Sequence, residues 1–226
     1  MSKIIVALDG ISESVALEFA QLLSGEVWGF KVNDLLVQHG VEIIKKLKPY
    51  GKVFADPKVH DIPKTIANSV KHFAEAGADL ITVHGSAGRE GLKAAAKNRG
   101  HSSILAITAL TSLTERDTDE IYGLSPQAVV EKFARIAVEC DLQGVVCSPQ
   151  ELQYLSSYSS LIKVTPGVRP SDYSSSGYGV KDDQSRVATP ESAVSQGASL
   201  LVIGRPIMES SHPLEKVRHI NESINT

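Results

Sequence analysis

The segment FADPKVHDIPKT, residues 54–65, places two carboxylates and a lysine at fixed intervals, between an apolar run and a turn-forming proline. Its charged residues are Asp56, Lys58 and Asp61. An ammonium group held between two carboxylates is a fixed positive charge. Such a group can oppose negative charge that develops on a substrate and can then donate a proton to the same atom. The segment is therefore a candidate catalytic site.

Eight short apolar runs along the chain could position this segment. Stretches with helical spacing separate them, such as the apolar stripe of Val15, Phe19, Leu22 and Leu23. Apolar strands joined by helices predict a parallel sheet covered by helices, and eight repeats in 226 residues match an α/β fold, a single-domain (β/α)8 TIM barrel. An open doubly wound sheet is the alternative, although DGISES after the first run lacks the G-x-G-x-x-G phosphate fingerprint. The runs are residues 3–9, 26–32, 52–57, 79–84, 103–109, 144–148, 161–167 and 200–205.

Charged residues close several of these runs. In a barrel of this type the active site lies at the carboxyl ends of the strands, where Asp9, Lys31, Asp56, Lys58 and His84 are expected. Strand alternation puts Asp56 and Lys58 on the same side of the chain. A salt bridge at the barrel mouth would explain any single pair, and His84 could be a hydrogen-bonded cap. The coincidence of four strand ends favours a catalytic site.

Two loops near the end of the chain combine glycine with arginine, in TPGVRP (165–170) and IGRP (203–206). Backbone N–H groups at glycine can approach an anion closely, and an arginine offers a fork of donors that suits phosphate oxygens. Barrels of this fold commonly bind phosphate after their seventh and eighth strands. The polar stretch 169–186, rich in Ser, Gly, Tyr and Asp, is typical of a lid or a disordered insert, and we predict a mobile loop that grips the phosphate.

Composition narrows the range of partners. A net charge of -3 and scattered basic residues supply no field for nucleic acid, and the first apolar run is too short for a signal peptide or a membrane span. The two cysteines, Cys140 and Cys147, suit free thiols in a reducing cytoplasm. No residues have metal-ligand spacing and no cofactor motif occurs, so neither a metal nor an organic cofactor is predicted.

Seven motifs follow one another along the chain: ALD (7–9), FKV (30–32), DPKVHDIPKT (56–65), TALTS (108–112), TPGVRP (165–170), DQSRVATP (183–190) and VIGRPI (202–207). In these motifs the chain resembles the orotidine 5'-monophosphate decarboxylases of the bacterial type over essentially its whole length. The resemblance implies conversion of orotidine 5'-monophosphate to uridine 5'-monophosphate and CO2 in de novo pyrimidine biosynthesis, without a cofactor or metal.

The resemblance also implies residue roles. Lys31, Asp56, Lys58 and Asp61 would form an alternating charged tetrad in which Lys58 donates the proton. Asp61 would reach into the active site of the other subunit of a homodimer. Ile62 and Thr65 would accompany it there.

Other matching residues would bind the rest of the substrate. Asp9 and Lys31 would bind ribose hydroxyls, and Thr111 would line the pyrimidine pocket beside Ser112. The residues that would hold the phosphate and close the lid are Arg169, Gln184, Gly204 and Arg205. Two features depart from the family pattern: the stretch between Arg169 and Gln184 is longer, and Asn33 replaces a common glycine.

Two other functions remain open. A Mg²⁺-dependent decarboxylase or aldolase of the same superfamily would act on a sugar phosphate, but those relatives carry a metal-binding glutamate near the end of strand 2, where this chain has Lys31. A non-catalytic nucleotide-binding barrel would keep the glycine and arginine loops without needing the charged tetrad.

Overall fold

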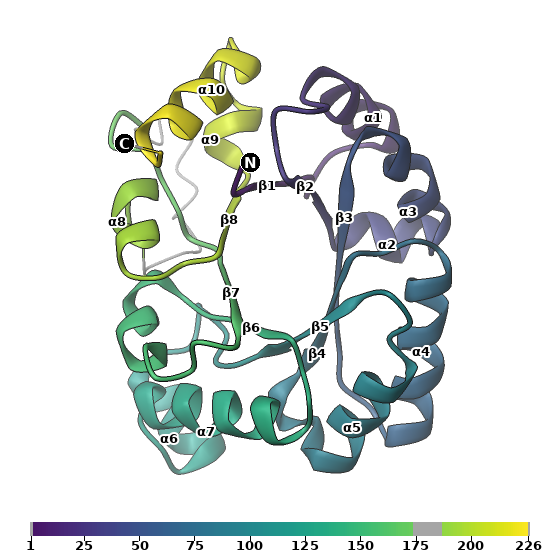
Figure 1. The fold of residues 1–226 in the computed structure, drawn as a ribbon, viewed down its shortest axis with the longest axis vertical. Coiled ribbons are helices and arrows are strands. Elements are labelled where there is room, and N and C mark those ends of the chain that lie inside the picture. The colour runs from purple at the N-terminus through teal and green to yellow at the C-terminus, as the bar shows by residue number, and fades with distance from the viewer. Residues whose placement is uncertain (1, 174–186, 226) are drawn as a thin grey trace.

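The computed structural model describes residues 2–173 and 187–225. Within them the chain forms a closed barrel of parallel strands, in which each strand pairs with its neighbour in sequence and β1 pairs with β8. Helices surround the barrel (Figure 1). The (β/α)8 prediction is thereby confirmed, and the open doubly wound sheet is excluded. The strands are β1 (Ile4–Ala7), β2 (Gly29–Val32), β3 (Lys52–Val59), β4 (Leu80–His84), β5 (Ser103–Ile107), β6 (Gly144–Val146), β7 (Ile162–Thr165) and β8 (Leu200–Ile203).

The helices follow the strands and turn one apolar face toward the barrel. In α4 that face is Ile66, Val70 and Ala74. In α1 it is Ala16 and Ala20, continued by Leu23, whereas the predicted stripe member Leu22 is 48% exposed. The α-helices are α1 (Glu13–Leu22), α2 (Asp34–His39), α3 (Glu42–Leu47), α4 (Pro63–Glu75), α5 (Gly88–Asn98), α6 (Glu115–Tyr122), α7 (Pro126–Glu139), α8 (Pro190–Ser195), α9 (Arg205–Met208) and α10 (Pro213–Ser223); the 3-10 helices are η1 (Lys48–Tyr50), η2 (Gly85–Ala87) and η3 (Pro149–Leu155).

Strand alternation divides the core into two layers. In β4, for example, Ile81 and Val83 pack against the helices, while Leu80 belongs to the small cluster inside the barrel. That inner cluster consists of Ile5, Ala7, Phe54, Leu80, Leu105, Val164, Leu200 and Val202. Because side chains two residues apart share a face of a strand, the next inward position of β4 is Thr82, which is buried.

Strand β3 departs from regular pairing beside the predicted catalytic segment. Ala55 pairs with Ile81, but the next pair is Val59 with Val83, so four steps along β3 match two along β4. Pro57, within this irregular stretch, has no N–H to donate, and Lys58 has a left-handed φ of 49°. Bulges of this kind redirect side chains next to active sites.

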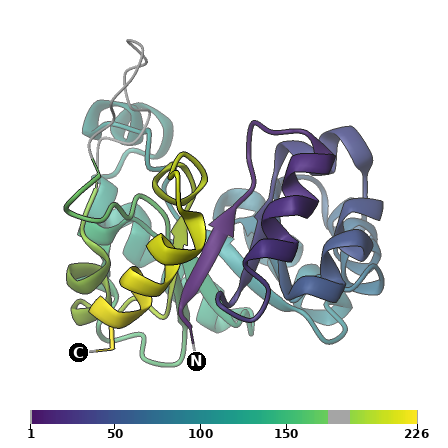
Figure 2. The same ribbon diagram turned by 90° about the horizontal axis from the view of Figure 1, so that it is seen from above.

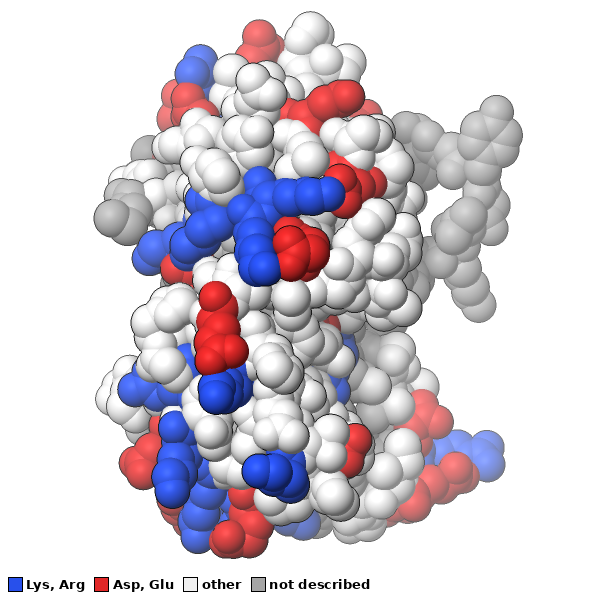
Figure 3. All heavy atoms as spheres, turned by 90° about the vertical axis from the view of Figure 1, so that its right-hand side faces the viewer, with Lys and Arg blue, Asp and Glu red and all other residues white. Residues whose placement is uncertain are grey.

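The outer surface mixes charges of both signs. On the face seen in Figure 3, acidic and basic side chains lie side by side. Ion pairs of 2.6 Å join Lys45 to Glu42 and Lys48 to Asp79. Figure 2 shows both chain ends at the same end of the barrel, from which β1 runs toward the opposite end. No helix in the described part of the chain is long and apolar enough to cross a membrane.

Candidate active site

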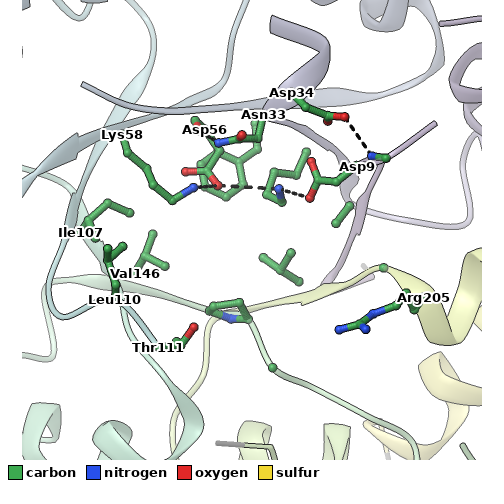
Figure 4. A pocket seen from close by; sticks show the side chains of 18 of the residues that line it. Asp9, Asn33, Asp34, Asp56, Lys58, Ile107, Leu110, Thr111, Val146 and Arg205 are labelled. Atoms are coloured by element: carbon green, nitrogen blue, oxygen red, sulfur yellow. Dashed lines mark hydrogen bonds and ion pairs between the residues drawn. The ribbon is translucent and has the colours of Figure 1, made fainter. Parts of the chain in front are cut away.

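A cavity of about 750 Å³ opens at the carboxyl ends of the strands. It brings together residues that lie far apart in the sequence, from the end of β1 to the loop after β8 (Figure 4). Eight of the predicted site residues line it: Asp9, Lys31, Asp56, Lys58, Thr111, Arg169, Gly204 and Arg205.

Four of these residues form a chain of alternating charges along one side of the cavity (Figure 4). The Nζ atom of Lys31 lies 2.6 Å from Oδ2 of Asp9 and 3.7 Å from Oδ2 of Asp56. The same Asp56 oxygen lies 2.7 Å from Nζ of Lys58. The Lys31 and Asp56 side chains are only 10% and 9% exposed, and removing one partner of a buried ion pair typically costs about 3–5 kcal/mol. The array of Asp9, Lys31, Asp56 and Lys58 is therefore a mutually dependent unit.

The backbone at Lys58 is held in an unusual conformation. A non-glycine residue with positive φ costs about 1–3 kcal/mol and persists where its surroundings fix it. Here the Lys58 N–H donates to the Thr82 hydroxyl at 2.9 Å, and that hydroxyl donates to Oδ1 of Asp56 at 2.8 Å. Asp56 and Lys58 do reach the same cavity, as predicted, but through this irregular segment rather than through regular alternation.

Asn33 has a structural task in place of the glycine that is commoner in the family. Its Nδ2 atom donates to the carbonyl oxygen of Asp56 at 2.6 Å, linking the end of β2 to β3. The next residue, Asp34, accepts the N–H of Gly10 through Oδ2 at 2.9 Å, and so links the start of α2 to the loop after β1. Both residues line the cavity.

The opposite side of the cavity carries the arginines, and Arg205 lies across the cavity from Lys58 (Figure 4). Arg169 follows β7, and its guanidinium lies 5.6 Å from the centroid of the Tyr173 ring. The Tyr173 hydroxyl donates to Glu209 at 2.8 Å; burial, together with this bond, raises the pKa of that hydroxyl. Gly204 and Arg205 follow β8 at the start of α9.

Three predicted site residues lie elsewhere. Asp61, Ile62 and Thr65 are exposed at the start of α4, and none belongs to the cavity wall in the described part of the chain. Asp61 accepts the N–H of Ile62 at 2.6 Å, and Ile62 is 66% exposed although it is apolar. Gln184 lies outside the described residues.

His84 is part of a polar cluster beside the cavity rather than of its wall. Its Nδ1 atom accepts the N–H of Ser86 at 3.3 Å and caps η2, which agrees with the capping interpretation. Its ring stacks on that of His60, with centroids 5.1 Å apart. Burial, reinforced by the nearby His60 and Lys58, lowers the pKa of His84.

Both cysteines are free and buried, and Cys147 lines the cavity. Burial raises the pKa of the Cys147 thiol to about 12. Burial also raises the pKa of Cys140. Among the residues that the structure describes, no group of three or more His, Cys, Asp or Glu side chains could hold a metal ion.

Comparison with known proteins supports the resemblance seen in the motifs. A family model described as the orotidine 5'-phosphate decarboxylase / HUMPS family matches residues 2–220. The chain belongs to this family. Orotidine 5'-phosphate decarboxylase of Nitrosospira multiformis is 38% identical over 98% of this chain and 93% of the relative. Orotidine 5'-phosphate decarboxylase of Staphylococcus aureus (strain Mu3) is 37% identical over 97% of this chain and 96% of the relative. The crystal structure of orotidine 5'-phosphate decarboxylase from Lactobacillus acidophilus superposes on this structure with a TM-score of 0.84 and 30% sequence identity. The match covers 100% of this chain and 100% of the Lactobacillus chain.

Sequence reasoning missed two polar residues of the site. Asp34 directly follows Asn33, but nothing in its spacing showed that it would contact Gly10. The inward position of Thr82 could have been predicted, because it stands two residues before His84 in a predicted strand, and alternation places both on the inward face. Its contacts with Asp56 and Lys58 depend on the β3 irregularity, which the sequence does not reveal.

Proposed function

We propose that the chain decarboxylates orotidine 5'-monophosphate, giving uridine 5'-monophosphate and CO2 without a cofactor. The observation that carries the proposal is the array of Asp9, Lys31, Asp56 and Lys58, centred on the buried Lys31 and Asp56, at one side of the cavity opposite Arg205. Family membership supports the same reaction. A reducing cytoplasm, where this pathway would run, suits the two free cysteines.

The reaction breaks the bond between C6 of the pyrimidine ring and its carboxylate. The electron pair stays on C6 in an sp2 orbital, which the ring carbonyls cannot delocalise as they would an enolate. The ammonium of Lys58, fixed by Asp56 at 2.7 Å, supplies a positive charge where this pair forms, and it then donates a proton to C6. Lys31 and Asp9 would bind the ribose hydroxyls beside it.

The rest of the substrate would bind across the cavity. Thr111 would line the pyrimidine pocket, and the phosphate would lie against Arg169, Gly204 and Arg205, with Gln184 completing the contact. Arginine forks suit phosphate oxygens geometrically. Binding energy from this remote group would be used to order the reacting end.

Two chains would form a homodimer with shared active sites. Asp61, Ile62 and Thr65 form an exposed surface that includes a large apolar side chain, and they would complete the site of the partner. Asp61 would then be the fourth member of the charged tetrad.

Mixed dimers test this sharing. Asp56→Ala and Asp61→Ala should each be inactive, but a dimer containing one of each has one site with both lesions and one with neither. Random assembly of equal amounts should restore about a quarter of wild-type activity. The two chains must be co-expressed or refolded together, and each variant refolded alone is the control. A purified mixed dimer without activity would show that Asp61 serves its own chain.

The main alternative is a Mg²⁺-dependent enzyme acting on a sugar phosphate. Lys31 argues against it, since a lysine that is ion-paired with Asp9 offers no oxygen ligand to Mg²⁺. A direct ultraviolet assay for loss of orotidine 5'-monophosphate, with EDTA present, separates the readings. Turnover of orotidine 5'-monophosphate in EDTA supports the proposal. Binding of the nucleotide without turnover favours a non-catalytic barrel, and turnover of a sugar phosphate that EDTA abolishes, with none of orotidine 5'-monophosphate, favours the metal enzyme.

A further inference from the structure

We propose that Thr82 is a positioning residue for the decarboxylation, and that its hydroxyl fixes both the Asp56 carboxylate and the backbone of Lys58. The inference rests on the proposed function and concerns a residue of β4 that does not line the cavity. Thr82 acts through its two partners, which do line it.

The buried Thr82 hydroxyl both donates and accepts a hydrogen bond. A hydroxyl has one hydrogen to donate and two lone pairs to accept with. Thr82 donates to Oδ1 of Asp56 at 2.8 Å and accepts the N–H of Lys58 at 2.9 Å, and its side chain is 0% exposed. The Thr82 hydroxyl oxygen therefore links the Asp56 carboxylate to the main chain of Lys58, and these two residues act together in the proposed reaction.

The irregular pairing of β3 explains why this link is needed. Between Ala55 and Val59 the strand is out of register with β4, so the main chain there lacks its regular ladder partners. The Lys58 N–H is bonded to a side chain instead, while φ of Lys58 is held at 49°. The direction in which the Lys58 side chain leaves the strand depends on this angle, and so the Thr82 contact helps to aim the ammonium.

Because of the Thr82 hydroxyl, the two carboxylate oxygens of Asp56 have different partners. Oδ1 is held by Thr82, while Oδ2 accepts from Lys58 and lies 3.7 Å from Lys31. Without the hydroxyl, Oδ1 would be a buried acceptor without a donor, and the carboxylate would turn to bring it toward one of the ammonium groups. That rotation would shift Nζ of Lys58 away from the reacting carbon.

Another buried threonine shows what a purely structural hydroxyl looks like. Thr118 in α6 is also buried, and its hydroxyl donates to the carbonyl oxygen of Glu115 within the same helix. It contacts no member of the charged array. Thr118→Val therefore removes a buried hydroxyl without touching the reaction, and it is a matched control for Thr82→Val.

The experiment measures kcat for orotidine 5'-monophosphate and Kd for uridine 5'-monophosphate in wild type, Thr82→Val, Thr82→Ser and Thr118→Val. A displacement of about 1 Å at the reacting group can cost about a hundredfold in rate, so we expect kcat of Thr82→Val to fall by about that factor. Its Kd should stay within about threefold of wild type, because the phosphate contacts are unchanged. Thr82→Ser restores the hydroxyl and should recover most of kcat, and Thr118→Val should keep it.

The outcomes separate this inference from the function on which it rests. If wild type turns over substrate and Thr82→Val keeps kcat within about threefold, or if Thr82→Ser is as impaired as Thr82→Val, the role of Thr82 is overturned alone. A wild-type chain without turnover would overturn both. Should Thr82→Val not fold, Thr82→Ala takes its place, because it removes the hydroxyl without setting a methyl group against the carboxylate.

Discussion

The two sides of the cavity are built in different ways. The array side, made by β1 to β4, joins its charged groups through contacts of 2.6–3.7 Å that involve buried side chains on strand ends. The arginine side, made after β7 and β8, places Arg169 and Arg205 on loop and helix-start positions, where both are half-buried. The reacting end of the site is thus set by the barrel itself, whereas the phosphate end is set by the segments that leave it. We expect damage to the first to lower kcat and damage to the second to lower affinity.

Lys58→Ala should have the largest effect, because it removes the proton donor and the counter-charge together. The rate should fall by roughly ten-thousand-fold or more, while uridine 5'-monophosphate still binds. Single-turnover decay of substrate absorbance measures the first effect and calorimetric titration the second. Lys93→Ala, on the exposed face of α5, is the control. Activity within about tenfold of wild type would remove Lys58 from the mechanism.

Arg205→Ala should weaken phosphate binding on the arginine side of the cavity. Loss of a charged hydrogen bond costs about 1.5–3 kcal/mol, so uridine 5'-monophosphate should bind roughly tenfold to a hundredfold more weakly. Uridine, which has no phosphate, should bind the variant and wild type equally. Exposed Arg116, paired with Glu120, provides the control substitution Arg116→Ala. Equal weakening of both ligands would mean that Arg205 does not bind phosphate.

Asn33→Gly should produce a smaller change on the array side. It removes the bond from Nδ2 to the carbonyl oxygen of Asp56 and restores the residue commoner in the family. A neutral hydrogen bond contributes about 1 kcal/mol, so kcat should fall roughly fivefold with Kd for uridine 5'-monophosphate unchanged. An unaltered kcat would show that the other contacts hold Asp56 sufficiently.

The smallest effect concerns stability near His84. Burial lowers its folded-state pKa below 6.5, so the unfolded chain binds a proton first as the pH falls. The free energy of unfolding should therefore decrease below about pH 6.5, with a slope from this group of less than one proton, and level off below the folded pKa. His84→Asn keeps an acceptor for Ser86 and should reduce the slope in urea titrations, whereas His101→Asn at an exposed position serves as the control. If the free energy of unfolding depends on pH equally steeply in His84→Asn and in wild type, His84 is not the source of this pH dependence.

Much of the array could be predicted, because parallel strands in a barrel bring their carboxyl ends to one rim. For that reason the cavity wall contains Lys31, Asp56 and Lys58, as predicted. The family motifs suggested which role each of them has. Apolar spacing was a poorer guide in α1, where tight packing selected Ala16 and Ala20 over Leu22.

Local spacing could not predict contacts that depend on pairing between strands. Asn33 looked like a departure from the family pattern, yet it bonds to the main chain of β3. The hydrogen-bond partners of Thr82 depend on the register shift between β3 and β4, which no single residue in the sequence indicates. The exposed position of Asp61, just before α4, agrees with a role in a partner subunit, but that role remains a prediction.

Burial of Cys147 has a consequence for chemical probes and inhibitors. A thiol in the wall of an active-site cavity would ordinarily be a target for electrophiles and oxidants, both of which react with the thiolate. Burial raises the pKa of this thiol to about 12, so it stays protonated at neutral pH. Alkylating reagents aimed at this cavity should therefore label Cys147 far more slowly than they label an exposed cysteine.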